Sequence, residues 1–215
     1  MIRADLRGRA NAELESKSPV PPSRVLGGGQ NLESGYQPMS NSRKNILAIS
    51  GSTRIHSSNE AILNSIASSC KEVLNVQLYT GIADLPHFNP DTDNEQVPLA
   101  VKSFRDLIDK ADGVIICTPE YVFSLPGALK NAIEWTVSTT VFSDKPTAVI
   151  VASGLGEKAY ESLLLIMKTV GAKVGEQSSL LIKGARSKVD DKGQLADQST
   201  KKQLDSLMGS FIANL

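Results

Sequence analysis

The stretch Ile46-Leu-Ala-Ile-Ser-Gly-Ser-Thr-Arg-Ile-His-Ser-Ser-Asn-Glu60 decides how the rest of the chain is interpreted. It begins as a short apolar strand, continues as a polar loop that contains Gly51 and Arg54, and ends in the first turn of an amphipathic helix. Such a loop directs unpaired backbone N–H groups, and the positive end of the helix dipole, at one point in space. The sequence therefore predicts an anion site, typically for a phosphate, at the start of this helix.

The overall composition favours a single soluble domain. The 215 residues are enough for one well-buried domain and too few for two of comfortable size. Lys plus Arg and Asp plus Glu each number 23, so no basic excess favours nucleic acid or an anionic membrane surface. We expect no signal peptide, because no apolar h-region leads the sequence, and no apolar run approaches the ~20 residues of a membrane helix. Two cysteines and two histidines predict neither a disulfide framework nor a histidine-rich metal site. We expect a cytoplasmic protein with reduced thiols.

Residues 1–42 differ in composition from the rest of the chain. Their prolines, the glycine run 27–29 and scattered charges show no helix or strand period, which is typical of disorder. We expect a disordered N-terminal extension here and one domain over residues 43–215. Met39 lies just before the first expected strand, and our hypothesis is that the functional protein starts there.

From Asn45 onward, expected strands alternate with expected helices. Short apolar runs predict strands at 46–50, 76–79, 114–117, 147–152 and 178–182. Apolar stripes at spacings of three and four predict four of the helices: Ile62, Leu63, Ile66, Ala67, Cys70, Val73 and Leu74; Ala100, Phe104, Leu107, Ile108 and Ala111; Ala128, Leu129, Ala132, Ile133 and Val137; and Leu204, Leu207, Met208 and Phe211. Right-handed crossovers then favour an α/β fold with a five-stranded, doubly wound parallel sheet.

The remaining helix, roughly 158–170, is apolar around much of its circumference. Its apolar residues are Tyr160, Leu163, Leu164, Leu165, Ile166 and Met167. A helix buried on one face needs only one such stripe, so we expect its second apolar face to be a subunit interface. The expected assembly is a homodimer or homotetramer.

The first loop carries many donors to an anion. It offers the hydroxyls of Ser52, Thr53, Ser57 and Ser58, the amide of Asn59 and the guanidinium of Arg54, which together match the oxygens and charge of a phosphate monoester. The loop has neither a Walker motif nor a Gly-x-Gly-x-x-Gly turn, so a mononucleotide fits better than a pyrophosphate. The alternative is a capping box formed by Ser57 and Glu60, which needs no ligand.

Two further loops should meet the first at the carboxyl ends of the strands. The second follows the third strand and offers Tyr121 and Phe123 as aromatic surface beside a planar ring; alternatively, its aromatics pack on a neighbouring helix. The third, Ser153-Gly-Leu-Gly156, lets its backbone approach a ring edge at Gly154, or is a plain tight turn.

These loops carry the residues of a known family. Gly51-Ser-Thr-Arg54, with Ser57 and Asn59, resembles the first signature of the NADPH-dependent FMN reductase family, which includes quinone, azo-dye and chromate reductases. The second signature is matched by Pro119-Glu-Tyr121, Ser124, Pro126-Gly127, Leu129-Lys-Asn-Ala-Ile133 and Trp135. Asp84-Leu-Pro86, Phe88-Asn-Pro-Asp91 and Asp191-x-Gly193 also agree, so the resemblance covers the chain from about residue 44 onward.

The resemblance implies a flavodoxin-like three-layer sandwich with strand order 2-1-3-4-5 that binds FMN non-covalently. By position, the phosphate would be held by Ser52, Arg54, Ser57 and Asn59, and the flavin ring would be framed by Pro119, Glu120 and Tyr121. From their place in the three loops, we also expect Ser58, Val122, Phe123, Ser153 and Gly154 to contact the cofactor. Val122 stands where the family usually has Asn, and Gly156-Glu-Lys158 stands where it commonly has a double glycine.

The implied activity is ping-pong transfer of hydride from NADPH or NADH to FMN, and then to a small-molecule electron acceptor such as a quinone, azo compound or flavin. We expect no catalytic side chain, because the cofactor carries this chemistry. The alternative is a flavodoxin-like electron carrier that does not oxidise NAD(P)H directly; neutral charge and Arg54 count against it. A hydrolase built on His56 or His87 is a weaker alternative, because neither lies in a nucleophile-elbow context.

Overall fold

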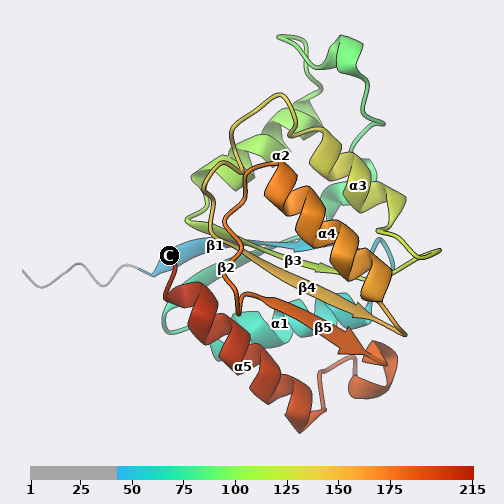
Figure 1. Cartoon of the computed structure of the whole chain (residues 1–215), viewed down its shortest axis with the longest axis vertical. Helices are drawn as coiled ribbons and strands as arrows, with labels where there is room; N and C mark the ends of the chain where they lie inside the picture. Colours follow the sequence, from blue (N-terminus) through green and yellow to red (C-terminus); the bar gives the residue numbers. More distant parts are fainter. Residues whose placement is uncertain (1–42) are drawn as a thin grey trace, which may run out of the picture. The chain divides into compact units, whose positions relative to one another are not determined.

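The computed structural model describes residues 43–215, which contain one parallel five-stranded sheet (Figure 1). The strand order is β2-β1-β3-β4-β5, as the resemblance to the family implied. The strands are β1 (Lys44–Ser50), β2 (Leu74–Tyr79), β3 (Gly113–Thr118), β4 (Thr147–Ser153) and β5 (Ser179–Lys183). The change of direction in this order lies between β1 and β3, so their carboxyl ends form the expected ligand edge.

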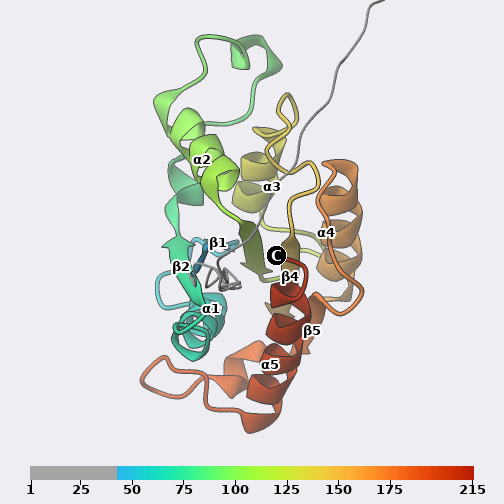
Figure 2. The same ribbon diagram turned by 90° about the vertical axis from the view of Figure 1, so that its left-hand side faces the viewer.

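Helices cover both faces of the sheet and complete three layers. Figures 1 and 2 show α1 and α5 on one face, and α2, α3 and α4 on the other. Their bounds are α1 (Ser58–Ser69), α2 (Leu99–Lys110), α3 (Gly127–Glu134), α4 (Glu157–Thr169) and α5 (Gln198–Ile212). Short 3-10 turns occur at η1 (Gly81–Asp84), η2 (Pro90–Thr92) and η3 (Ala185–Lys188).

The middle residues of the central strands are apolar and buried because both faces of these strands are covered. In β1, Leu47 and Ile49 belong to the core under α2–α4, whereas Ile46 and Ala48 belong to the core over α1 and α5. Every residue of β3 is buried. This pattern is typical of a parallel sheet between two layers of helices, and it fixes the register of the loops at the carboxyl edge.

The expected strands and the α5 stripe are confirmed, but parts of three helix stripes were wrong. Helix α1 ends at Ser69; Val73 lies in the turn after it and is half-exposed, and Leu74 opens β2. The apolar run continued past the helix because β2 begins only four residues after Cys70. In α2, Val101 rather than Ala100 faces the core. Val137 lies beyond the end of α3 and is 65% exposed.

The predicted N-terminal extension and the hypothesis about Met39 lie outside the described residues. Within residues 43–215, none of the helices has the length and apolar character required to cross a bilayer. The cytoplasmic location expected from the sequence stays a prediction.

Candidate functional site

The three loops singled out in the sequence leave neighbouring strands at the same edge of the sheet. β3 pairs with β1 on one side, where Cys117 lies opposite Ser50, and with β4 on the other, where Thr118 lies opposite Val151. Gly51 seats the first loop directly on the second. Its N–H donates to the Cys117 carbonyl at 2.8 Å, and a Cβ at this position would lie 2.3 Å from Thr118 Oγ1. Only glycine permits this approach.

The first loop presents nearly buried polar side chains at the start of α1. Ser52 and Ser57 are each 5% exposed. Their hydroxyls accept backbone N–H groups, from Arg54 at 3.3 Å and from Glu60 at 3.2 Å, respectively. Ser57 is therefore the N-cap of α1, as the capping-box interpretation required. A hydroxyl that accepts in this way still has its own proton to donate to an anion. The cap and the anion site are thus compatible.

The amide of Asn59 is held by a thiol on the neighbouring strand. Cys117 Sγ donates to Asn59 Oδ1 at 3.3 Å, and both side chains are buried. Burial raises the pKa of the Cys117 thiol far above its usual range, so the thiol stays protonated and able to donate. With its carbonyl oxygen engaged by Cys117, Asn59 keeps its amide N–H₂ as a donor.

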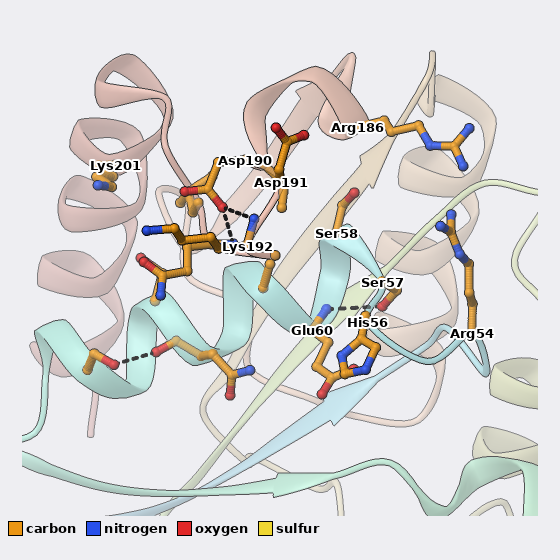
Figure 3. A pocket seen from close by; sticks show the side chains of 18 residues that line it. Arg54, His56, Ser57, Ser58, Glu60, Arg186, Asp190, Asp191, Lys192 and Lys201 are labelled. Carbon is orange, nitrogen blue, oxygen red and sulfur yellow. Dashed lines mark hydrogen bonds between the residues drawn. The ribbon is translucent and has the colours of Figure 1, made fainter.

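Arg54 and Ser58 line the end of a pocket beside this loop. Arg54 is exposed and takes part in none of the seven ion pairs within residues 43–215. Figure 3 shows its side chain extending beside Ser57 and Ser58. The helix itself supplies no acceptor for the N–H groups of Ser58 and Asn59, which are the first two residues of α1. These groups together favour a bound anion.

Glu120 has a partner that the sequence did not reveal. Its two carboxylate oxygens accept N–H groups at the start of α4, from Gly156 at 3.3 Å and from Ala159 at 2.9 Å. Gly156 precedes the helix at φ +102°, and a Cβ there would lie 2.8 Å from Leu181 Cδ1. A carboxylate at this position satisfies orphan donors and complements the helix dipole. Glu120, which the sequence predicted beside the flavin ring, therefore connects the second loop to the third through hydrogen bonds.

The second loop contains a two-residue hairpin with an unusual backbone. Tyr121 and Ser124 exchange both backbone hydrogen bonds at 3.0 Å, and the residues between them have positive φ, 52° at Val122 and 56° at Phe123. This is the pattern of a type I′ turn, which favours Asn-Gly because β-branched residues are strained there. The turn geometry accounts for the Asn that the family usually has at the position of Val122.

The aromatic side chains of this hairpin point away from the core. Tyr121, Val122 and Phe123 are 50%, 96% and 72% exposed, so the alternative in which they pack on a neighbouring helix was wrong. By contrast, Pro119 is buried at the base of the loop. The hairpin thus presents apolar surface at the carboxyl edge of the sheet.

The third loop joins the site through its backbone. Ser153 Oγ lies 3.5 Å from the Glu120 carbonyl, to which it donates, and the Gly154 carbonyl accepts the N–H of Gly184 at 3.1 Å. A Cβ added at Gly154 would meet no atom within 4 Å, so this residue borders open space. Ser153 and Gly154 therefore lie beside the second loop, as the sequence predicted from strand order.

Two residues at the end of the second signature, Asn131 and Trp135, stabilise the fold and do not line the candidate site. Asn131 accepts the N–H of Phe88 at 2.7 Å and donates to the Pro86 carbonyl at 2.9 Å. Trp135 Nε1 donates to the same carbonyl at 2.7 Å, and its ring meets Phe88 edge to face. These contacts anchor the loop after η1 on α3.

Sequence reasoning missed several residues that line the pocket beside Arg54. They come from η3, the turn after it and α5, and include Arg186, Lys192 and Lys201 (Figure 3). The signature Asp191-x-Gly193 lies in this turn and could have drawn attention to it. For metal binding, no group of three or more His, Cys, Asp or Glu side chains gathers anywhere in the described part of the chain.

Comparison with known proteins agrees with this geometry. A family model described as NADPH-dependent FMN reductase matches residues 44–186. The chain is 41% identical over 110 residues to an NADH:(hydroxy)cinnamate reductase subunit of Vibrio ruber, an alignment that covers 51% of this chain and 54% of that protein. It is 35% identical over 113 residues to an NAD(P)H:quinone oxidoreductase of Solanum tuberosum, which covers 51% and 58%. The chain thus spans little more than half the length of these relatives.

A solved structure extends the similarity beyond the aligned sequence. The flavoenzyme FerB, an NAD(P)H:(acceptor) oxidoreductase from Paracoccus denitrificans, superposes with a TM-score of 0.70 and 28% sequence identity. The superposition covers 79% of this chain and 96% of that one. The family match includes the first loop, the hairpin loop and the third loop in one segment. With its flavodoxin-like strand order and these three loops, the chain belongs to the NADPH-dependent FMN reductase family.

Proposed function

We propose that the protein is an FMN-dependent NAD(P)H oxidoreductase that reduces a small-molecule acceptor such as a quinone, azo compound or flavin. One observation carries the proposal: the first loop gathers buried hydroxyls, the Asn59 amide and Arg54, which forms no ion pair within residues 43–215, at the N-terminus of α1, next to two loops with open apolar surface. The names of the relatives, which include a quinone oxidoreductase and a flavoenzyme, support the same activity.

The residues present fit an FMN phosphate. Ser52 and Ser57 would donate from hydroxyls, Asn59 from its amide and Arg54 from its guanidinium, and Gly51 seats the loop that carries them directly on the end of β3. A phosphate monoester accepts such donors with three terminal oxygens and nearly two negative charges. The set needs no further cation.

Bound FMN would supply the redox chemistry by accepting and returning hydride. The protein's task is then to hold and expose the ring. Glu120 and Gly156 fix the third loop against the second, while Tyr121, Val122 and Phe123 offer apolar surface that excludes water from one side. No side chain is assigned a catalytic proton transfer.

The first experiment is spectroscopic. Purified protein reconstituted with FMN should show flavin absorbance, and NADPH or NADH added without oxygen should bleach it; a quinone should then restore it. Flavin that neither nucleotide bleaches would favour the electron carrier. Protein that binds no flavin under any reconstitution would refute both functions.

The phosphate role is tested by Arg54→Ala. Loss of a charge-assisted hydrogen bond should raise the Kd for FMN by about tenfold, a change of ~1.4 kcal/mol. Lys102→Ala is the control. Lys102 is exposed on α2, which covers the opposite face of the sheet from α1 and is far from the first loop in sequence. An unchanged Kd in the Arg54 variant would contradict the assignment.

We also propose self-association through α4, in line with the expected homodimer or homotetramer. Leu165 on this helix is 66% exposed, whereas Leu163 and Met167 are buried within the chain and Tyr160, Leu164 and Ile166 are half-buried. Light scattering on the wild type and on Leu165→Glu tests it. A monomeric wild type would remove the proposal.

A further inference from the structure

The tip of the hairpin in the second loop combines backbone strain with exposed apolar side chains. Val122 and Phe123 both adopt positive φ, which neither residue type favours. They are 96% and 72% exposed, so the fold gains little from burying them. Strained residues without a compensating contact in the fold occur mainly at sites that bind ligands. The tip is therefore a candidate contact for a molecule that enters the site.

Leu155 extends this apolar surface from the third loop. It is 60% exposed, and the next residue, Gly156, donates its N–H to Glu120 Oε1 at 3.3 Å. Leu155 is thus held close to the base of the hairpin. We name Val122, Phe123 and Leu155 the apolar rim. In Figure 1 the loops that carry it leave the same end of the sheet, and the loop between β3 and α3 projects beyond that end.

The second loop presents no free charge beside the rim. Glu120 is the only charged residue among residues 119–126. Its carboxylate accepts the N–H groups of Gly156 and Ala159 at the start of α4. The fully exposed side chains of the loop are apolar or carry a hydroxyl. Such a surface binds a neutral molecule by burial of apolar area and offers no partner to an anion.

The rim is a departure of this chain from its family. Val122 stands where the family usually has Asn, which fits a type I′ turn without strain. Valine adds apolar surface there at the expense of turn stability. A ligand contact at this position accounts for such an exchange, whereas packing within the described part of the chain does not.

We propose that the apolar rim binds the alkyl substituent of a neutral quinone acceptor and so determines which acceptors the protein prefers. The proposal rests on the function proposed above, because an acceptor reaches the flavin only at this edge of the sheet. The overall reaction takes a hydride from NAD(P)H and a proton from solvent, and it converts the quinone to its hydroquinone. The alkyl substituent takes no part in these steps. Its burial against the rim strengthens binding of the acceptor.

The test measures how kcat/KM depends on the length of the alkyl chain. The probes are 2-alkyl-1,4-benzoquinones from methyl to hexyl, used with full-length protein reconstituted with FMN. Each methylene that the rim covers should raise kcat/KM by up to about fourfold. The variant Val122→Asn with Phe123→Gly removes two rim side chains and suits the turn, so it should fold. Its preference for the hexyl over the methyl quinone should be about tenfold smaller than that of the wild type.

The matched control is Val137→Asn. Val137 is 65% exposed, but it lies past the end of α3, whereas the hairpin precedes the start of this helix. The control should keep the chain-length dependence of the wild type.

A second readout needs no turnover. The dimethyl ethers of the same alkylhydroquinones are not acceptors, and calorimetry measures their Kd with and without FMN. The hexyl ether should bind to the wild type about tenfold more tightly than to the double variant, whereas the methyl ether should distinguish the two proteins much less.

Two results would overturn the proposal. One is an equal chain-length dependence in the wild type and the double variant, including none in either. The other is a dimeric wild type that becomes monomeric in the double variant and shows no preference for long alkyl chains, which would make the rim an interface between copies of the chain. Failure of the proposed function is recognised separately, because NAD(P)H would then not bleach the flavin of the wild type, while the ethers still report whether the rim binds an alkyl chain.

Discussion

Glu120 Oε2 accepts the N–H of Ala159 at 2.9 Å, so a side chain of the loop after β3 caps the helix that follows β4. The contact joins two βα units whose loops both border the candidate flavin site. It fixes the third loop through the helix to which that loop leads. The Glu120 carboxylate, together with the hydrogen bond from Ser153 Oγ to the Glu120 carbonyl, thus sets the spacing of the two loops.

Replacement of Glu120 by Ala should therefore loosen both loops. It leaves the N–H groups of Gly156 and Ala159 without their acceptor, and it should lower the free energy of unfolding by about 1–2 kcal/mol, the scale of a lost N-cap. Chemical denaturation of the apoprotein measures this loss. Glu120→Gln keeps one acceptor oxygen and should lie between the two. Equal stability of all three proteins would show that the cap contributes nothing.

Removal of the Cys117 thiol should affect FMN binding through Asn59. Cys117→Ala leaves Asn59 Oδ1 without its donor and frees the amide to rotate. The Kd for FMN should therefore rise several-fold, which corresponds to a loss of about 1 kcal/mol or more in binding free energy. Cys117→Ser restores a donor and should recover most of the affinity. Titrations run well below the unfolding temperature of both variants separate this role from a loss of packing. A serine variant as weak as the alanine variant would contradict it.

Residues that a type I′ turn favours should stabilise the protein when they are placed at the tip of the hairpin. Val122→Asn with Phe123→Gly replaces two side chains at φ 52° and 56° with residues that adopt positive φ easily. Both side chains are mostly exposed, so little packing is lost. We expect a gain of about 1–2 kcal/mol in the free energy of unfolding, the scale of the relieved backbone strain.

The matched control for the hairpin is Ser124→Ala at the end of the same turn, where the backbone hydrogen bonds remain. If the double variant is no more stable than this control, the turn is not strained. The second readout is the activity of the double variant with different electron acceptors. The two substitutions remove apolar side chains at the candidate site as well as the backbone strain.

Acid should destabilise the protein through Asp93. Burial favours the neutral carboxyl, but hydrogen bonds from Arg105 and Ser138 and the charge of Arg105 outweigh it and hold the pKa of Asp93 below its usual range. Because the folded pKa is depressed, this contribution is complete above the unfolded pKa of about 3.9 and is lost as the pH falls through the folded pKa. The Asp93–Arg105 ion pair measures 2.6 Å.

Denaturant titrations between neutral pH and pH 2 test this dependence. Asp93→Asn should cost about 1–3 kcal/mol at pH 7, the scale of a buried charge left without its partner, and the difference from the wild type should shrink toward pH 2. A difference that stays constant with pH would assign the cost to packing rather than to the carboxylate.

The sequence predicted what depends on local pattern and strand order. Residues 46–49 of β1 are all apolar because both faces of the strand are covered there, and this made the strand recognisable. The α5 stripe is buried at each expected position, because that helix packs through one face only. The convergence of the three loops followed from the order of the strands alone.

The remaining features depend on contacts between distant residues. Glu120 meets Ala159 across 39 positions and Asn59 meets Cys117 across 58, so no local period could have revealed either contact. Arg186 joins the pocket beside Arg54 only because η3 lies against α1, and Lys201 reaches the same pocket from α5. The ends of α1 and α3 were misplaced for another reason: apolar residues after a helix imitate its stripe.

The contact of Gly51 with Thr118 has a consequence for the kinetics of cofactor loading. Because backbone touches side chain there in the protein by itself, the distance between the first two loops is set before any nucleotide arrives. A flavin would enter a preorganised site and order few protein groups on binding, so the loss of conformational entropy on binding should be small. Apoprotein should therefore capture flavin in a single kinetic phase whose rate rises linearly with flavin concentration, without a slow rearrangement after the encounter.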